Sequence, residues 1–377
     1  MPFSSLGLSP ALLMALESQK FTVPTPIQEA AVPVILRKKD VLGIAKTGSG
    51  KTAGYVLPLL MNLQETAGLN NRNANVLVLV PTRELAEQVK DVFKVFSKAL
   101  PQPVKTLAVY GGVSINPQMM ALQGVNVLVA TPGRLLELVD SNSVHLSAIE
   151  TLVLDEADKL LNLGFKEELN KILALLPEKR QNILFSATLS KDLDQIQQLM
   201  LHEPVVIEIA EEEASLDLIN QVAYIVSAEK KGPFLRYLIH HHEMKQVLVF
   251  ASSVQQVDAI VNKLNKNNIQ AKAIHSKKSQ GARTDAITHF KSGKLKVLVA
   301  TDLMARGIDI AFLPFVINYE LPRSPKDYVH RIGRTGRAAA EGTAISLVSQ
   351  DELHHFEVIQ KKMQKQVNLI DSAGIKI

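Results

Sequence analysis

The chain has 377 residues, 46% of them hydrophobic and 21% charged, which excludes a disordered chain and at this length favours two globular domains. The absence of cysteine excludes disulfides and thiolate chemistry, no apolar run approaches the length of a membrane span, and the N-terminus lacks the basic start of a secretion signal, so we expect a cytoplasmic protein with no membrane partner. The net charge of +5 is uneven, because residues 1–208 hold 19 Lys and Arg against 20 Asp and Glu whereas residues 217–377 hold 23 against 14, an excess that fits either a polyanionic partner or a plain solvated surface.

Strand-like apolar runs alternate with helical patterns along the chain, which predicts an α/β protein with mainly parallel sheets flanked by helices. An early helix is indicated by Ser9 as its N-cap and Pro10 at its first position. The strands predicted in the first half are Val41–Ala45, Val76–Val80, Thr106–Val109, Val127–Ala130, Thr151–Leu154, Ile183–Phe185 and Val205–Ile209.

The first predicted strand leads into a glycine-rich loop that is typical of nucleoside triphosphate sites. Gly48 and Gly50 allow backbone N–H groups to turn toward phosphate oxygens, Lys51 supplies a charge for the outer phosphates, and Thr52 begins a helix with a hydroxyl that suits a magnesium ion. The nucleotide-binding residues predicted here are Ala45, Lys46, Thr47, Gly48, Ser49, Gly50, Lys51 and Thr52. The alternative is an ordinary turn between a strand and a helix.

A run of acidic residues follows the predicted strand Thr151–Leu154. Asp155 lies where the rim of a parallel sheet meets a ligand crevice and is predicted to hold magnesium, and Glu156 is the candidate that orients the attacking water and accepts its proton. The alternative is a pair of exposed acids at the start of a helix, which suits the helix dipole. The glycine-rich loop earlier in the chain favours the catalytic interpretation.

The second half repeats the architecture without a phosphate loop of its own. Its predicted strands are Gln221–Ile225, Val247–Phe250, Ala271–Ile274, Val297–Ala300, Phe315–Asn318 and Ala344–Val348. We predict an N-terminal domain over 1–208, a linker over the acidic stretch 209–216 and a C-terminal domain over 217–377, with the nucleotide cleft between the two domains.

Taken in order, the motifs resemble those of the DEAD-box ATP-dependent RNA helicases, a family with two tandem RecA-like domains. Besides the phosphate loop, the matching segments are Phe21–Gln28, Pro81–Ala86, Gly111–Gly112, Thr131–Arg134, Asp155–Asp158, Ser186–Thr188, Val249–Ala251, Gln280–Arg283, Ala300–Asp302, Ala305–Asp309 and His330–Arg337. Three further segments resemble the bacterial RhlE-type group: Gly7–Pro10, Asn318–Pro322 and Arg337–Ala340.

The resemblance implies roles in ATP binding for residues outside the phosphate loop. Gln28 carries both a donor and an acceptor that match the edge of adenine, and Phe21 would stack on the ring, although ordinary core packing is the alternative for Phe21. Arg334 and Arg337 resemble arginine fingers that stabilise the transferring phosphate, and Asp309 is placed like the residue that meets the ribose.

The resemblance also implies RNA contacts, mainly to phosphate and ribose. The RNA-binding residues it assigns are Thr82, Arg83, Gly112, Thr131, Arg134, Gln280, Arg283, Thr301 and Arg331, and those that couple the two ligands are Asp158, Ser186 and Thr188. Aromatic residues make up only 5% of the chain, so base stacking is not expected to be the main contact with RNA. We therefore expect little preference for a particular RNA sequence.

We therefore expect a monomeric RNA-dependent ATPase that uses ATP and Mg2+ and locally unwinds short RNA duplexes. Two alternatives remain, an ATP-gated RNA clamp and a DNA translocase with the same core. His240–His242 and His354–His355 lack the spaced partners of a zinc site and are predicted to be surface residues.

Overall fold

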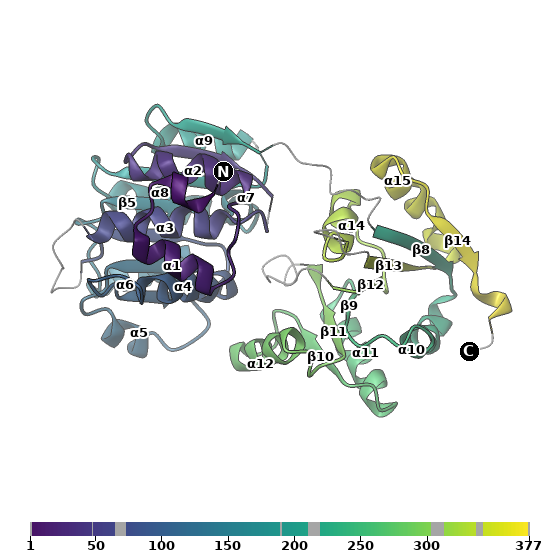
Figure 1. Cartoon of the computed structure of the whole chain (residues 1–377). Helices are drawn as coiled ribbons and strands as arrows, with labels where there is room; N and C mark the ends of the chain where they lie inside the picture. The colour runs from purple at the N-terminus through teal and green to yellow at the C-terminus, as the bar shows by residue number, and fades with distance from the viewer. Residues whose placement is uncertain are drawn as a thin grey trace. The chain divides into compact units, whose positions relative to one another are not determined.

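The computed structural model describes residues 2–46, 48–64, 73–188, 191–209, 219–302, 313–336 and 342–375. The chain divides into two compact units, residues 1–211 and 212–377, which are described separately (Figure 1). Three predicted site residues, Thr47, Asp309 and Arg337, lie outside the described residues, as does the predicted linker apart from Ile209.

The first unit contains a sheet of seven parallel strands in the order β3-β4-β2-β5-β6-β1-β7. The strands are β1 (Val41–Ile44), β2 (Val76–Leu79), β3 (Thr106–Val109), β4 (Val127–Ala130), β5 (Thr151–Leu154), β6 (Gln181–Ser186) and β7 (Val205–Glu208). The five central strands are buried along their whole length, which explains why they are continuous apolar runs rather than alternating ones.

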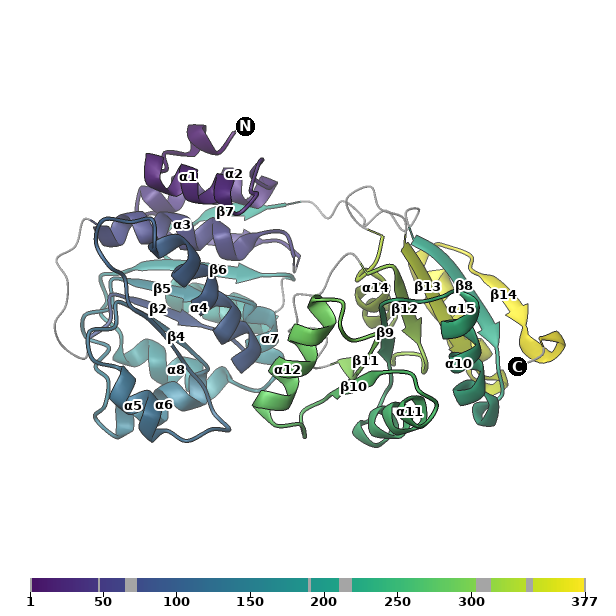
Figure 2. The same cartoon turned by 60° about the horizontal axis from the view of Figure 1, so that its bottom comes forward.

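Helices cover both faces of this sheet (Figure 2). They are η1 (Phe3–Leu6), α1 (Pro10–Ser18), α2 (Pro26–Leu36), α3 (Lys51–Gln64), α4 (Arg83–Ser97), α5 (Asn116–Ala121), α6 (Pro132–Asp140), α7 (Ala157–Asn162), α8 (Lys166–Leu175) and α9 (Lys191–Met200). Successive strand residues point to opposite faces, so Val76 and Val78 pack with α2, α3 and α4 whereas Leu77 and Leu79 pack with α6 and α8.

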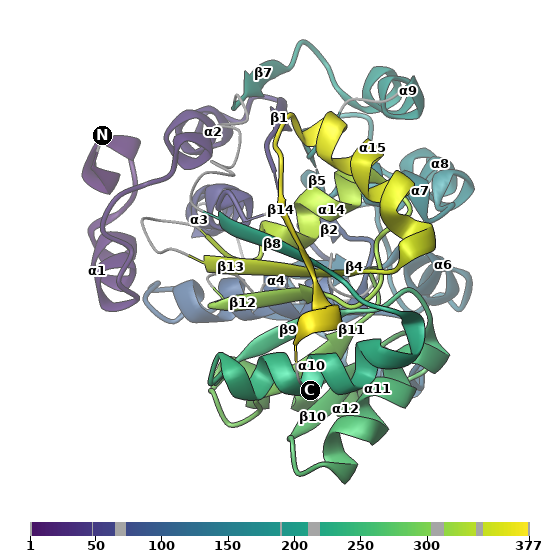
Figure 3. The same ribbon diagram turned by 90° about the vertical axis from the view of Figure 1, so that its right-hand side faces the viewer.

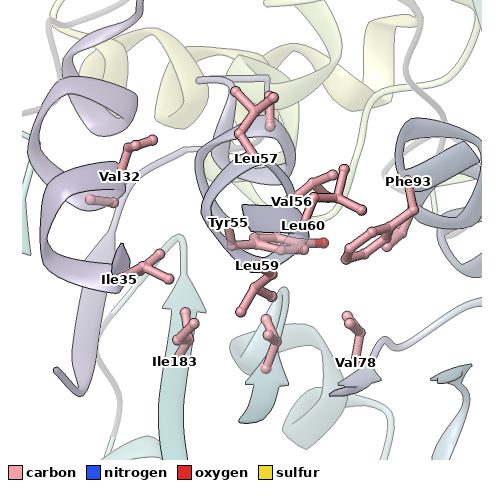
Figure 4. Close-up of a cluster of buried hydrophobic side chains, with 14 of the residues drawn as sticks. Val32, Ile35, Tyr55, Val56, Leu57, Leu59, Leu60, Val78, Phe93 and Ile183 are labelled. Carbon is pink, nitrogen blue, oxygen red and sulfur yellow. The ribbon is translucent and has the colours of Figure 1, made fainter. Parts of the chain in front are cut away.

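Helix α3 lies at the centre of the first of these two cores. Val32 and Ile35 of α2 and Phe93 of α4 flank it, while Ile183 and Val78 come from the strands (Figure 4). The packing on several sides fixes the position of α3, whose first residue is Lys51 of the phosphate loop.

The second unit contains another sheet of seven parallel strands, in the order β10-β11-β9-β12-β13-β8-β14. The strands are β8 (Ile219–Ile225), β9 (Val247–Phe250), β10 (Ala271–Ile274), β11 (Val297–Ala300), β12 (Phe315–Asn318), β13 (Gly342–Val348) and β14 (Asn368–Asp371). The helices are η3 (Ala228–Lys230), α10 (Lys231–His241), α11 (Val254–Lys266), α12 (Gln280–Lys291), α14 (Pro325–Ile332), η4 (Gln350–Glu352), α15 (Leu353–Met363) and η5 (Ser372–Gly374).

In this unit α10 and α11 share one core with the sheet, and α14 and α15 lie on the opposite side (Figure 3). Strand β14, which pairs with β8, was not predicted. The two parallel sheets flanked by helices confirm the predicted α/β class.

Candidate functional site

Three neighbouring strands of the first sheet bring the phosphate loop, the acidic run and the Ser-Ala-Thr segment to one edge. Strand β6 lies between β1 and β5, and all three run in the same direction. Adjacent strands lie about 4.8 Å apart, so segments that leave their carboxyl ends are close neighbours. Residues far apart in sequence thereby form one polar site at the end of a buried sheet.

The phosphate loop has a backbone that requires glycine. Gly48 and Gly50 have φ angles of 84° and 91°, in the left-handed region. A side chain at Gly50 would place its Cβ 2.5 Å from Nε2 of Gln28, because that amide donates a hydrogen bond to the Gly50 carbonyl (3.0 Å). The other side of the Gln28 amide accepts from the backbone N–H of Thr25 (3.0 Å), so the first turn of α2 is fixed to the loop.

These contacts use one N–H and one oxygen lone pair of the Gln28 amide, which is 1% exposed. The second N–H and the second lone pair are the groups that match the predicted contact with adenine. Phe21 is 39% exposed and packs against Phe96 with the two rings steeply inclined, at 71° and 5.9 Å between centroids. Its exposure is compatible with the predicted stacking on a base.

Lys51 is the buried cation of the site. Its side chain is 6% exposed, and Nζ donates a hydrogen bond to the carbonyl of Ala45 (2.6 Å). Burial lowers the pKa of Lys51, and the negative charges of Asp155 and Glu156 oppose that effect. The ammonium is held at the start of α3 and forms no close ion pair with the described residues, a suitable arrangement for a group that binds phosphates.

Asp155 is the buried anion of the site. The hydroxyl of Tyr55 donates to Oδ2 (3.0 Å), and Oδ1 has no hydrogen-bond partner among the described residues. Burial raises the pKa of Asp155, while the charge of Lys51 and the Tyr55 hydrogen bond act against it. A buried carboxylate oxygen without a partner among the described residues fits a hard cation such as Mg2+.

No three His, Cys, Asp or Glu side chains gather as a metal cluster within the described residues.

Glu156 occupies a strained position at the start of α7. Its φ of 54° and ψ of 48° are left-handed, which is costly for a residue with a side chain and is typical of functional sites. Its side chain is buried, and Oε1 lies 2.7 Å from Nζ of Lys159, one turn along the helix. The carboxylate is therefore held in one orientation beside Asp155.

The Ser-Ala-Thr segment lies beside the acidic run. Asp158 accepts long hydrogen bonds from the Ala187 N–H (3.4 Å) and the Thr188 hydroxyl (3.5 Å). The Ser186 hydroxyl donates to the Thr188 carbonyl (2.8 Å). The structure therefore brings together the three residues predicted to couple the ligands.

The Tyr55 hydroxyl offers a direct test of how the site controls Asp155. We expect Tyr55→Phe to raise the pKa of Asp155 further, because the Tyr55 hydrogen bond stabilises the charged form of the carboxyl group. The carboxylate is the form that holds a cation, so activity of the variant should fall at a higher pH than in the parent, with little change above neutrality. The measurement is ATP turnover against pH at several Mg2+ concentrations.

The matched control is Tyr328→Phe, which removes an equally buried hydroxyl that shares a hydrogen bond with the neutral Ser346 (3.0 Å) instead of with a carboxylate. If ATP turnover falls at the same low pH in Tyr55→Phe and in the parent, this role for Tyr55 is wrong.

The RNA-facing residues predicted in the first unit follow β2, β3 and β4, the other half of the same sheet edge. The Arg83 guanidinium lies over Gly112, where an added Cβ would be 3.0 Å from Nη1. Arg134 donates to Glu137 and to the Val113 carbonyl (both 2.8 Å), and it is largely buried. The two arginines thus brace the glycine turn after β3, while the Thr82 hydroxyl caps α4 and Thr131 precedes α6.

In the second unit the predicted residues differ widely in exposure. Thr301 and Arg334 are half-buried, whereas Arg283 and Arg331 are 2% exposed. Gln280 begins α12, and its side chain lies outside the described residues.

Arg331 is enclosed by several partners. Its guanidinium forms a two-point ion pair with Asp302 and donates to Oδ1 of Asn318 (3.1 Å) and to the carbonyl of Glu320 (2.6 Å). It also lies 5.0 Å from the centre of the Phe250 ring.

Sequence reasoning missed the residues that orient the predicted ones. Tyr55 contacts Asp155, Lys159 contacts Glu156, the two predicted catalytic carboxylates, and Asn318 contacts Arg331. Lys159 carried a usable signal, because it lies three residues after Glu156, the spacing at which side chains on a helix meet.

Two family models match the chain: DEAD/DEAH box helicase over residues 25–196, and helicase conserved C-terminal domain over residues 230–339. The ATP-dependent RNA helicase CshA of Listeria monocytogenes is 37% identical over 366 residues, covering 97% of this chain and 69% of that protein. CshA of Geobacillus kaustophilus is 37% identical over 368 residues, covering 96% and 78%. The solved structure of S. cerevisiae Dbp5 bound to RNA and ADP BeF3 is 28% identical, with a TM-score of 0.84, and the match covers 99% of this chain and 96% of that chain.

Proposed function

Since the chain belongs to the DEAD-box family of ATP-dependent RNA helicases, we propose how its own residues couple ATP hydrolysis to the binding and local unwinding of RNA. Its two sheets, each with its flanking helices, form two tandem RecA-like domains. The observation that carries the proposal is the gathering of Lys51, Asp155 and Glu156 in one buried site at the carboxyl edge of the first sheet.

In this proposal the phosphate loop and Lys51 bind the triphosphate, and Glu156 orients the attacking water and accepts its proton on a carboxylate oxygen. Asp155 and Thr52 hold Mg2+, which when bound neutralises charge on the phosphate oxygens. Lys159 and the left-handed backbone fix the direction of the Glu156 carboxylate. The Tyr55 hydrogen bond favours the ionised form of Asp155 and so opposes the effect of burial.

Family membership supports the remaining roles. Arg334 and Arg337 supply guanidinium groups to the transferring phosphate, and Asp309 meets the ribose. RNA phosphates and riboses contact the residues that follow the strands of each sheet, namely Thr82, Arg83, Gly112, Thr131, Gln280 and Thr301. Asp158, Ser186 and Thr188 couple these contacts to the nucleotide through their shared hydrogen bonds.

Membership of the RhlE-type group is the finer hypothesis, supported by the three segments named above, while the two bacterial relatives compared are named CshA. We also propose a monomeric core that works in the cytoplasm. Every helix of the described part falls short of the length and hydropathy that a bilayer-spanning segment needs.

The test is ATP turnover with no nucleic acid, with single-stranded RNA and with DNA of matched sequence. We expect strong stimulation by RNA and little by DNA, together with release of one strand from a short RNA duplex in the presence of ATP. Equal stimulation by DNA would favour a DNA translocase, and ATP turnover without strand release would favour an RNA clamp.

A further inference from the structure

Seven lysines gather at the amino edge of the second sheet, opposite the edge that carries the motifs. Helices α10, α11 and α12 end there, and strands β9, β10 and β11, which follow them and lie side by side in the sheet, begin there. We call this surface the lysine edge; its members are Lys245, Lys263, Lys266, Lys272, Lys291, Lys294 and Lys296.

The lysine edge holds much of the positive charge of the second half. In the helix ends and loops that form it, the only acidic residues are Glu243 and Asp285. Asp285 already pairs with Lys272 and with His289 (2.9 Å). Seven lysines against two acids account for more than half of the nine-charge excess of residues 217–377, where 23 Lys and Arg face 14 Asp and Glu.

The surface is polar and hollowed. A cavity of about 300 Å³ lies between the end of α11 and α12, and Gln270, Lys272, His289 and Lys294 line it together with Asn265. At the rim of this cavity, the Asn265 amide forms two hydrogen bonds with the backbone of Ala271 (both 3.0 Å).

No large hydrophobic side chain is exposed among the described residues from 231 to 300. A stable protein interface needs an apolar centre, and membrane insertion needs exposed apolar side chains. A surface of hydrated lysines around a polar hollow instead matches a chain of phosphates, whose binding depends on charge alone.

We propose that the lysine edge is a second RNA-binding surface, which holds the phosphodiester backbone of RNA that extends beyond the segment bound at the motif edge. The two edges are separated by strands of four residues, a span of about 13 Å at 3.3 Å per residue. The charges of this surface indicate a polyanion. The inference rests on the proposed function only where it identifies that polyanion as RNA.

The test is a triple variant, Lys245→Gln, Lys266→Gln and Lys294→Gln, of the whole chain. All three side chains are exposed, so folding should be unaffected. We expect about tenfold weaker binding of a long single-stranded RNA, and a plot of log K against log salt that is shallower by about 2, as for three lost phosphate contacts. Binding of a short RNA and ATP turnover at saturating short RNA should stay at the parent level.

The matched control is Lys361→Gln, Lys362→Gln and Lys365→Gln, which removes the same charge at the end of α15 on another part of the unit. An unchanged affinity and salt slope in the first variant, or equal losses in both, would overturn the inference. Displacement of the long RNA by polyglutamate of equal charge would also overturn it and assign the surface to an acidic protein. Failure of RNA to stimulate ATP turnover in the parent would reject the proposed function, whereas binding at the lysine edge would still be measured independently.

Discussion

Replacing Glu156 by Gln should reduce RNA-stimulated ATP hydrolysis by about 10²- to 10⁴-fold, the usual contribution of a positioned general base. The amide has the shape of the carboxylate but cannot accept the proton of the attacking water. ATP binding should persist, because Lys51 and the phosphate loop are untouched and the amide removes a negative charge near the phosphates. The measurement is single-turnover hydrolysis at saturating RNA beside a nucleotide-binding titration.

Two companion variants make this result specific. Glu137→Gln changes an exposed carboxylate on α6 that is also paired with a basic side chain, Arg134, and should leave hydrolysis nearly unchanged. Lys159→Met keeps the Glu156 carboxylate but removes the partner 2.7 Å away, so a smaller loss is expected. If Glu156→Gln hydrolyses ATP at the parent rate, the assignment of the water-orienting base is wrong.

The sequence predicted the sheets well because their strands are buried on both faces. Apolar runs such as Val76–Leu79 and Val247–Phe250 have no polar interruption, and the structure confirms them as strands. Strand β14 escaped prediction because it is largely exposed at the sheet edge, and its two apolar residues stand between Asn368 and Asp371 instead of in a longer apolar run.

The local parts of the site were also predictable, whereas the contacts that orient them were not. Gly50 and Lys51 belong to a loop whose chemistry follows from adjacent residues. The Tyr55 hydroxyl reaches Asp155 across 100 positions of sequence, and Gln28 reaches Gly50 across 22. Such contacts depend on strand order, because β1 and β5 become neighbours of β6 only in the folded sheet.

Arg331 shows another limit of prediction from sequence. A motif can identify a residue without revealing whether its side chain is exposed. The resemblance implies an RNA contact, yet the side chain is 2% exposed and its guanidinium joins Asp302 after β11 to Asn318 at the end of β12. Asn318 in turn donates to Ser346 of β13 (3.2 Å). These contacts indicate that Arg331 holds the carboxyl ends of three strands in place.

We therefore expect Arg331→Met to lower the free energy of unfolding of the second unit by about 3–5 kcal/mol. The reason is that the partly buried Asp302 carboxylate loses its positively charged partner. Hydrogen exchange of the whole chain should show lost protection in β11, β12 and α14, with the first unit unchanged. Arg323→Met, at an exposed arginine of the same unit, should have no such effect.

Arg331→Met combined with Asp302→Ala should recover part of the protection, since an apolar pair of this kind no longer buries a lone charge. Full protection in Arg331→Met with weaker RNA binding and a shallower salt dependence would instead show that the guanidinium contacts a phosphate. The two outcomes separate a residue that shapes the RNA-facing edge from one that touches RNA, which the motif alone does not distinguish.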